Sequence, residues 1–314
     1  MKNIFNLLLV SALAMSMQGC SKDLVVTDEP NDPEKFEEVQ LRLTGEVAYM
    51  TPETRLDANG FVDNDEFGVY TTGGKMGPNK ATVKNAKYVY KNGTIEAADD
   101  NNMIYWEDGK DLDIYAYYPY YSGSENKTQH LFTLPTDQSN ESNYNKSDFL
   151  RATEEDVAKN ANPVEMTFFH LMSKVSVTIT HDSSITDFDS LAKELTIENV
   201  VGTAKINLST GVVTPGSSAD KKITAFLMDS DNASFSAIMI PQGASNVKFR
   251  LKLGNDYYSS TMSINYESGK EYKYTFKVTK NEGALSLKST KIEIWGDGGT
   301  TATNMTKENS TSSN

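Results

Sequence analysis

The sequence predicts an all-β protein built from β-sandwiches, and three features of the chain support this fold class. Apolar and polar residues alternate with a period of two in many short stretches, as in strands with one buried and one solvated face. Turn signals rich in glycine, asparagine and aspartate separate these stretches at short intervals. Helical periodicity is scarce, and many short strands joined by such turns are typical of β-sandwiches.

The chain begins with a stretch typical of an export signal. Lys2 supplies a positive charge, and residues 4–17 are almost wholly apolar. A transmembrane helix needs about 20 apolar residues, so this shorter run predicts a signal peptide over residues 1–19.

Cys20 is the only cysteine in the chain and directly follows this signal. It ends the stretch "MQGC", which resembles the lipobox of bacterial lipoproteins. No internal disulfide is possible with one thiol, and acyl chains contribute about 0.8 kcal/mol of membrane binding per buried methylene. We therefore expect Cys20 to be the lipidated first residue of the mature protein. The alternative is a cleaved signal that happens to contain a cysteine. Residues 21–23 ("SKD") resemble an export signal that places lipoproteins outside the outer membrane of Bacteroidetes.

Residues 20–37 predict a lipidated tether, because "TDEPNDPEKFEE" is acidic, contains proline and offers little apolar surface. Strand-like alternation begins directly after it, over residues 39–44. The same pattern returns in five later stretches, which are residues 174–180, 248–253, 261–266, 271–278 and 291–294. The best helical candidate is residues 147–159, where Ser147 would cap a short helix, and a loop fits that segment equally well.

The chain is long enough for two domains with hydrophobic cores of their own. We expect the boundary within residues 164–180, where two strand-like halves meet at His170 and Leu171. The predicted domains are an N-terminal β-sandwich over residues 38–170 and a C-terminal β-sandwich over residues 171–297. Residues 298–314 are almost free of apolar side chains, so we expect a disordered tail.

The net charge of the chain limits the classes of partner that it is expected to bind. Lysine and arginine number 30 against 43 acidic residues, which gives a formal net charge of −13. Contacts to phosphate groups need clustered cations, so this balance argues against nucleic acid and anionic membrane surfaces. The acidity is more typical of a surface that keeps a protein soluble.

No pattern in the sequence assembles a catalytic site. His130, His170 and His181 are the only histidines, they lack metal-ligand spacing, and the motifs of nucleophilic and nucleotide-dependent enzymes are missing. The carboxylates of residues 63–66 ("DNDE") suggest calcium but lack the twelve-residue loop register, which favours a solvated turn and leaves an irregular calcium site open. We therefore predict a protein that is not an enzyme and has no cofactor and no metal.

The run "YAYYPYY" at residues 115–121 is the most unusual local feature. Tyr117, Tyr118 and Tyr121 could form a platform on which sugar rings stack. In the alternative, these amphipathic rings cover the edge of a core and keep their hydroxyl groups wet. We favour the structural role because aromatic residues in strands usually pack, and the exposure of the rings distinguishes the two.

Six segments taken together resemble the fimbrillin-like (Mfa-like) lipoproteins of Bacteroidetes. They are "TRLDANGFVDNDEFGVY" (54–70), "MIYWEDGKDLDIYAYYPY" (103–120), "DQSNESNYNKSDFLRA" (137–152), "VEMTFFHLMSKVSVTI" (164–179), "YESGKEYKYTFKV" (266–278) and "KIEIWGDGG" (291–299). The resemblance implies two tandem β-sandwich domains of transthyretin-like topology. It also implies a cell-surface fimbrial subunit, acting as stalk, tip or anchor, with other fimbrial subunits as partners. Assembly would follow β-strand addition, in which a strand of one subunit completes the open sheet of the next.

The resemblance assigns roles to both ends of the mature chain. The strand whose removal would open a groove contains Val39, Leu41 and Leu43. The donor strand contains Ile292, Ile294 and Trp295. In polymerising relatives an arginine-directed protease releases the first strand, and the arginines near it are Arg42 and Arg55.

The polar tail after Trp295 is a poor hydrophobic donor, so we expect an accessory or tip-like adhesion subunit. The alternative is an outer-membrane glycan-binding lipoprotein, and surface glycans or proteins of host or bacterial cells are candidate partners of either. The stretch "DSL" also resembles a Bacteroidetes O-glycosylation site, with Ser190 as acceptor, and an unmodified loop fits it equally.

Overall fold

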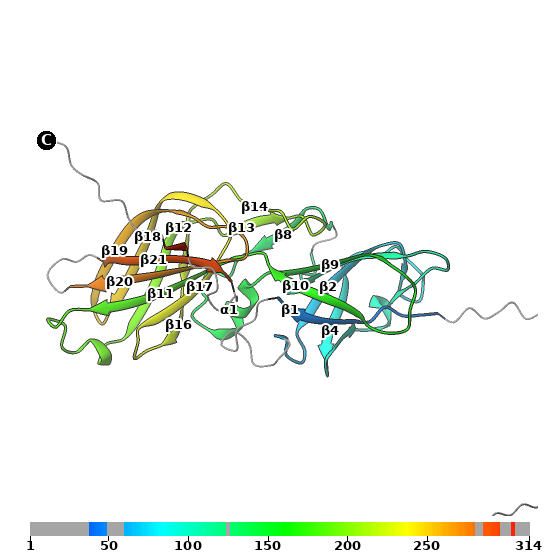
Figure 1. Ribbon diagram of the computed structural model, residues 1–314, viewed down its shortest axis with the longest axis horizontal. Coiled ribbons are helices and arrows are strands. Elements are labelled where there is room, and N and C mark those ends of the chain that lie inside the picture. Colours follow the sequence, from blue (N-terminus) through cyan, green and yellow to red (C-terminus); the bar gives the residue numbers. More distant parts are fainter. Residues whose placement is uncertain (1–37, 49–59, 124–125, 280–284, 296–302, 305–314) are drawn as a thin grey trace, which may run out of the picture. The chain divides into compact units, whose positions relative to one another are not determined.

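The computed structural model describes residues 38–48, 60–123, 126–279, 285–295 and 303–304 (Figure 1). The predicted signal peptide, Cys20, the tether and Arg55 lie outside these residues, as does most of the predicted tail. The all-β prediction is confirmed, since 22 strands accompany one α-helix and two short 3₁₀-helices in the described residues. No helix in this part of the chain is long and apolar enough to cross a membrane.

Seven strands of the N-terminal half close into a barrel in the order β1-β10-β9-β7-β2-β4-β5 (Figure 1). Their bounds are β1 Leu43–Val47, β2 Glu66–Thr72, β4 Ala86–Lys91, β5 Thr94–Ala97, β7 Leu112–Tyr118, β9 Leu150–Val157 and β10 Val164–His170. The closed sheet corrects the sandwich that the sequence predicted for this half. Buried and exposed residues alternate along the strands of a barrel as they do in a sandwich, so the sequence pattern does not distinguish the two. The barrel closes because β1 pairs with both β10 and β5.

The barrel encloses a hydrophobic cluster rich in aromatic rings. Phe61, Phe67 and Phe168 are fully buried, with their ring centroids 4.9–5.5 Å apart in edge-to-face pairs. Such pairs add about 0.5–1.5 kcal/mol each beyond the burial of their area. Leu41 and Leu43 belong to the same cluster, so the first strand is part of the barrel core.

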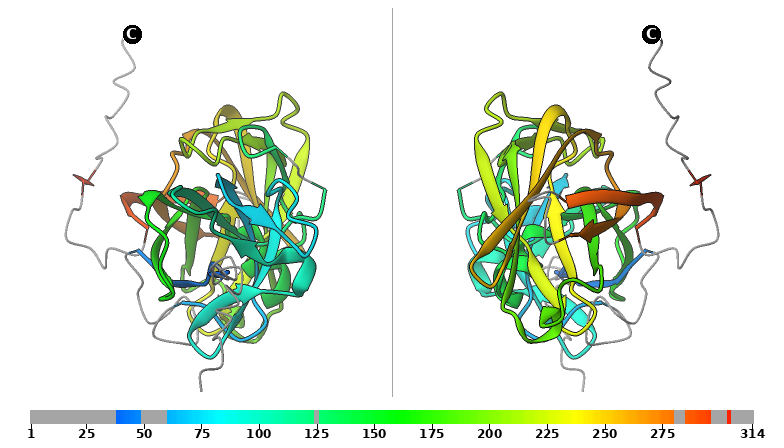
Figure 2. Two further views of the ribbon diagram at one scale, coloured as in Figure 1. Left: turned by 90° about the vertical axis from the view of Figure 1, so that its right-hand side faces the viewer. Right: turned by 90° about the vertical axis from the view of Figure 1, so that its left-hand side faces the viewer.

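Two larger sheets form the C-terminal half and lie in separate layers (Figure 2). The first, in the order β16-β17-β11-β20-β21-β22, contains β16 Phe226–Asp229, β17 Ser234–Met239, β11 Ser173–His181, β20 Lys270–Val278, β21 Leu285–Ile294 and β22 Thr303–Asn304. The second, in the order β15-β12-β18-β19, contains β15 Lys221–Thr224, β12 Lys193–Val200, β18 Gly243–Leu253 and β19 Asp256–Asn265. The ring of Phe249 lies 5.2 Å from the rings of Tyr274 and Phe276, so the sheets pack face to face.

Short elements join the two halves. A small sheet contains β8 (His130–Thr133), β13 (Thr203–Ile206) and β14 (Val213–Pro215), and β8 pairs with β13. Tyr117, Phe132 and Phe149 belong to the same hydrophobic cluster as the inner faces of the C-terminal sheets. Hydrophobic packing therefore continues across the boundary predicted at residues 170 and 171. The other short elements are β3 (Lys75–Met76), β6 (Ile104–Tyr105), η1 (Asp100–Asn102) and η2 (Phe188–Ser190).

The α-helix, α1 (Glu141–Ser147), lies earlier than predicted. Asn140 caps its start by accepting a hydrogen bond from a backbone N–H, and its last residue is the serine that was expected to begin a helix. The chain then forms β9, in which Leu150 and Ala152 are buried on one face. Most of the segment 147–159 is therefore the strand β9 (Leu150–Val157), and both the predicted helix and the loop alternative were wrong.

Candidate functional site

The first-strand segment, residues 39–47, closes the barrel, and its strand β1 is paired more fully along one edge than along the other. β1 pairs in parallel with β10 at five positions along its whole length. Its other edge pairs with β5 at one position only, where Leu43 lies opposite Ile95. Within the described strands, the rest of that edge has no ladder partner, which makes it an open sheet edge.

Apolar side chains anchor this segment in the barrel core. Leu41, Leu43 and Val47 are at most 5% exposed, and Val39 is half-buried. Full burial of one such side chain contributes about 1.5–3 kcal/mol relative to exposure. The strand predicted over residues 39–44 is displaced in the structure, since β1 starts at Leu43 and continues to Val47.

The ring of Phe168 packs directly on the backbone of β1. A Cβ atom on Gly45 would lie 2.7 Å from Phe168 Cε2, which is well inside the separation at which carbon atoms attract. Glycine is therefore needed where the two strands meet. The alternation of residues 164–170 was visible in the sequence, but no local signal showed that this strand pairs with β1.

Hydrogen bonds from other elements hold the upstream part of the segment. The backbone N–H of Leu41 donates to Ile104 O at 2.7 Å, and that of Trp106 donates to Val39 O at 3.2 Å. The Tyr88 hydroxyl donates to Leu41 O at 3.1 Å. Burial raises the pKa of Tyr88 well above its usual value, so this hydroxyl keeps its proton and remains a donor.

A cleft of about 360 Å³ runs beside the open edge of β1. Its lining residues are Thr44, Gly45, Glu46, Gly93, Glu165, Met166 and Thr167. Gly93 lies in the turn between β4 and β5. The first-strand segment is thus buried on its inner face and reached by solvent along one edge.

Arg42 lies one residue before β1 and is exposed. Its guanidinium donates to Ala161 O at 2.7 Å, and its carbonyl accepts the N–H of Val164 at 2.9 Å. The peptide bond after Arg42 is therefore held against β10, although the side chain is open to solvent.

The C-terminal strand β21 ends against the barrel. Trp295, which follows β21, is 4% exposed and stacks on the ring of His170 with centroids 3.8 Å apart. His170 Nδ1 lies 2.8 Å from Asp148 Oδ1. Ile292 and Ile294 are half-buried. Because His170 is the last residue of β10, that strand contacts both the first strand and the end of the predicted donor strand.

The structure corrects the predicted aromatic platform. Tyr117 is fully buried and Tyr118 is 5% exposed, while Tyr121 is half-buried. The Tyr117 ring stacks on Phe149 at 5.4 Å, and its hydroxyl donates to Asn85 Oδ1 at 2.7 Å. Burial raises the pKa of Tyr117 above its usual value. Tyr117 and Tyr118 pack in the core, so the three tyrosines do not form an exposed platform. The buried Tyr117 hydroxyl also differs from the wet hydroxyl groups expected of rings at a core edge.

The carboxylates proposed for calcium hold a turn. Asp63 Oδ1 accepts the N–H of Asn92 at 3.0 Å, and Asp65 Oδ2 accepts the N–H of Val62 at 3.0 Å. Over the described ranges, no group of three or more histidine, cysteine, aspartate and glutamate side chains is placed to hold a metal ion.

Ser190, the predicted glycosylation site, is exposed at the end of η2. Its hydroxyl donates to Asp187 O at 2.9 Å. The side chain is therefore accessible, and its modification stays a prediction.

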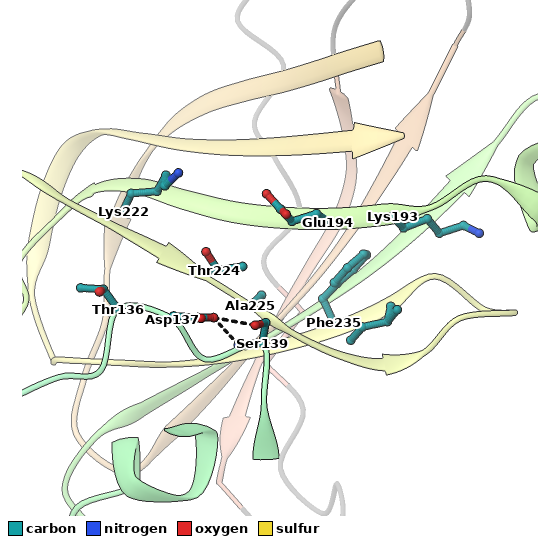
Figure 3. Close-up of a pocket in the computed structure, with 10 residues that line it drawn as sticks. Thr136, Asp137, Ser139, Lys193, Glu194, Lys222, Thr224, Ala225 and Phe235 are labelled. Atoms are coloured by element: carbon teal, nitrogen blue, oxygen red, sulfur yellow. Dashed lines mark hydrogen bonds between the residues drawn. The ribbon is translucent and has the colours of Figure 1, made fainter. Parts of the chain in front are cut away.

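A second cleft, of about 490 Å³, lies where the chain crosses from β15 to β16 (Figure 3). Hydrogen bonds from the hydroxyl and N–H of Ser139 lower the pKa of Asp137. Lys193, Glu194 and Lys222 also line it. Among the described residues, its lining contains neither histidine nor cysteine.

A family model described as fimbrillin-like matches residues 54–295. The chain belongs to the fimbrillin-like family. The match starts after β1 and includes β21, so this fimbrillin-like chain carries its first-strand segment ahead of the matched region.

Solved structures share the fold of this fimbrillin-like chain. One, a candidate cell adhesion protein from Bacteroides uniformis, is 23% identical, has a TM-score of 0.61, and aligns over 82% of this chain and 98% of its own. Another, a candidate cell adhesion protein from Bacteroides ovatus, is 19% identical with a TM-score of 0.64 and the same two coverages. Among curated proteins, none matches the sequence.

Proposed function

We propose that this protein is a non-enzymatic fimbrial subunit of the cell surface that acts in adhesion and joins its neighbours by β-strand addition. Membership of the fimbrillin-like family supports the fimbrial role. The uneven pairing of β1 supports strand addition, because one strand closes the barrel with a full ladder on one edge and a single paired position on the other. Loss of that strand would open a groove along β10, with pockets where Leu43 and Val47 now lie.

The position of β1 distinguishes the two predicted protease sites. A cut after Arg42 would leave all of β1 in the barrel, since the strand starts at Leu43. A cut after Arg55 would free the whole first-strand segment from the residues that follow. Of the two arginines, Arg55 is therefore the one at which cleavage would open the groove.

We propose an accessory or tip-like position in the fimbria for the uncut chain. Leu41, Leu43 and Val47 fill the core of the barrel, so an uncut subunit has no vacant groove for a donor strand. Ile292, Ile294 and Trp295 remain the proposed donor residues for a neighbouring subunit. Lipid on Cys20 would hold the mature chain at the outer membrane, with the tether of residues 20–37 between lipid and barrel.

The test is to shear native cells gently and separate filaments from cell bodies. Blotting shows where the protein is, and mass spectrometry identifies its first residue. Release with the filaments as a chain that begins at Cys20 would support an accessory or tip-like subunit. A filament chain that begins after Arg55 would instead indicate a polymerising subunit, and complete retention on cells would count against the fimbrial role.

A further inference from the structure

A cleft of about 410 Å³ opens between the end of β7, the start of β2 and α1. Its lining includes Asn64, Glu66, Tyr120, Tyr121, Pro135 and Lys146. These residues come from four separate segments of the N-terminal half. The volume lies within the range of about 300–1,000 Å³ that is usual for small-molecule sites.

The apolar part of this cleft is lined by Tyr118, Tyr120 and Tyr121 together with Pro119 and Pro135. Tyr120 and Tyr121 are both half-buried, unlike Tyr117 and Tyr118. The Tyr121 ring packs edge-on against Phe132 with centroids 6.3 Å apart, and its hydroxyl donates to Thr133 O at 3.3 Å. Tyr121 is thus fixed by its surroundings while part of it still faces the cleft.

Charged and amide side chains form the polar part. The side chain of Glu66 is 48% exposed, and its carboxylate lies 2.7 Å from Lys87 Nζ. That ammonium lies 5.5 Å from the centre of the Tyr120 ring. Asn64 and Lys146 are exposed. The cleft therefore presents hydrogen-bond donors and acceptors beside aromatic surface.

Three backbone N–H groups at the cleft are already paired, which argues against an added strand as its ligand. The N–H of Tyr120 donates to Glu66 O at 2.9 Å, and that of Asn64 donates to Tyr90 O at 3.0 Å. The N–H of Tyr121 donates to the Tyr117 hydroxyl at 3.2 Å. β-Strand addition needs free main-chain groups, so the side chains of the cleft are the better candidates for recognition.

We propose that this cleft binds a pyranose sugar of a surface glycan. A pyranose has a C–H face that packs on an aromatic ring and a rim of hydroxyl groups that both donate and accept hydrogen bonds. Tyr120 supplies the ring, the Glu66 carboxylate accepts from hydroxyl groups, and Lys146 and Asn64 donate to them. This inference rests on the adhesion role proposed above and adds to it a defined site. The cleft shares Tyr118 and Tyr121 with the predicted sugar platform and adds Tyr120.

The test measures binding of the mature chain, with Cys20→Ser to keep it free of lipid, to neoglycoproteins that carry galactose, N-acetylglucosamine, mannose, fucose or N-acetylneuraminic acid. We expect at least one of them to bind and Tyr120→Ala to weaken that binding by about tenfold or more. Lys146→Glu, at an exposed helix position, should weaken the same binding without affecting the core. Tyr257→Ala is the matched control, since Tyr257 is 49% exposed on β19, and it should leave binding within about twofold.

Failure of all five neoglycoproteins to bind would overturn the sugar site, as would binding that survives both Tyr120→Ala and Lys146→Glu. Thermal unfolding of each variant shows whether the fold is intact, and the Lys146 variant decides the matter if Tyr120→Ala does not fold. The shearing experiment is independent of this result. Normal release of both variants with filaments would leave the fimbrial role in place even if no sugar bound.

Discussion

At the scale of single residues, the His130 ring is buried, and no hydrogen bond in the described residues replaces those that its nitrogens would make with water. Its ring lies 4.5 Å from that of Tyr117 and 5.3 Å from that of Phe149, and neither ring nitrogen has a hydrogen-bond partner in the part of the chain that the structure describes. Burial lowers the pKa of His130 from 6.5 to about 4. The imidazole is therefore neutral in the folded protein at neutral pH.

We expect this histidine to make the fold sensitive to acid. As the pH falls from about 6.5 to about 4, the unfolded chain binds a proton that the folded state excludes, which lowers the free energy of unfolding by up to about 3 kcal/mol. His130→Phe should remove most of that dependence, because the ring surroundings are aromatic. Urea unfolding of both proteins across this pH range measures the difference.

His181→Phe is the control, since His181 is exposed to solvent. This variant should lose stability in acid as the natural chain does. Equal flattening of the pH dependence in both variants would contradict the role given to His130.

Gly68 of β2 lies directly beneath the ring of Tyr117. A Cβ atom at this position would overlap the ring atoms of Tyr117, which is fully buried. Gly68→Ala should therefore destabilise the fold by about 1–3 kcal/mol, as overpacking of a core does. Gly123→Ala should be nearly neutral, because a Cβ atom there meets nothing within 4 Å. Comparing the two midpoints of chemical unfolding tests this prediction, and equal midpoints would refute it.

The tyrosine run shows how far residue-level prediction reaches. Alternation along a strand indicates that some rings face a core, and this is what Tyr117 and Tyr118 do. The sequence did not show that β8 and Phe149 would cover the outer side of Tyr117, because these contacts join distant segments. Tyr120 was not part of the predicted platform, and the cleft that it lines also contains residues of β2 and α1, which the sequence did not bring together.

At the scale of elements, strands were easier to predict than their partners. Alternation located β11, β18, β20 and β21, because one buried face per strand leaves a local pattern. Barrel closure depends on the parallel pairing of β1 with β10, which lie more than 100 residues apart. The groove that loss of β1 would open could not be predicted from the sequence for the same reason, because the strands that pair with β1 form it.

The first strand offers a test of strand addition by complementation. A chain that begins at residue 49 lacks β1 and leaves the side of β10 that β1 covers without a partner. A synthetic peptide of residues 37–48 supplied separately should raise its thermal midpoint by refilling that side. The control peptide carries Leu43→Asp, which places a charge where a side chain is fully buried, and it should have no effect.

A stable truncated chain that ignores both peptides would contradict the role of β1 as a separable strand. If the truncated chain does not fold alone, co-expression with the peptide should recover it in soluble form. Recovery by the Leu43→Asp peptide as well would show that the effect is not strand insertion.

At the scale of the whole molecule, the N-terminal half is a closed barrel in place of the expected sandwich, whereas the C-terminal half has two sheets packed face to face. The hydrophobic packing does not follow the order of the chain. Tyr117, Phe132 and Phe149 of the N-terminal half pack in the same hydrophobic cluster as the C-terminal sheets, and β8 pairs with β13 across the predicted domain boundary. The stacking of Trp295 on His170 adds a contact between the end of β21 and the end of β10. Composition and turn spacing are enough to predict the fold class, but they do not indicate contacts between segments that lie far apart in the sequence.

These shared contacts predict that the halves unfold together. The chain has two tryptophans, of which Trp106 lies in the barrel cluster and Trp295 in the cluster of the C-terminal sheets. Fluorescence of Trp106→Phe therefore reports on the C-terminal half, and that of Trp295→Phe reports on the barrel. When Phe132→Leu is added to each variant, both reporters should shift to lower denaturant by the same amount, because Phe132 packs where the halves meet. Separate midpoints for the two reporters, or a shift in only one, would show instead that the halves are independent domains, as the sequence first indicated.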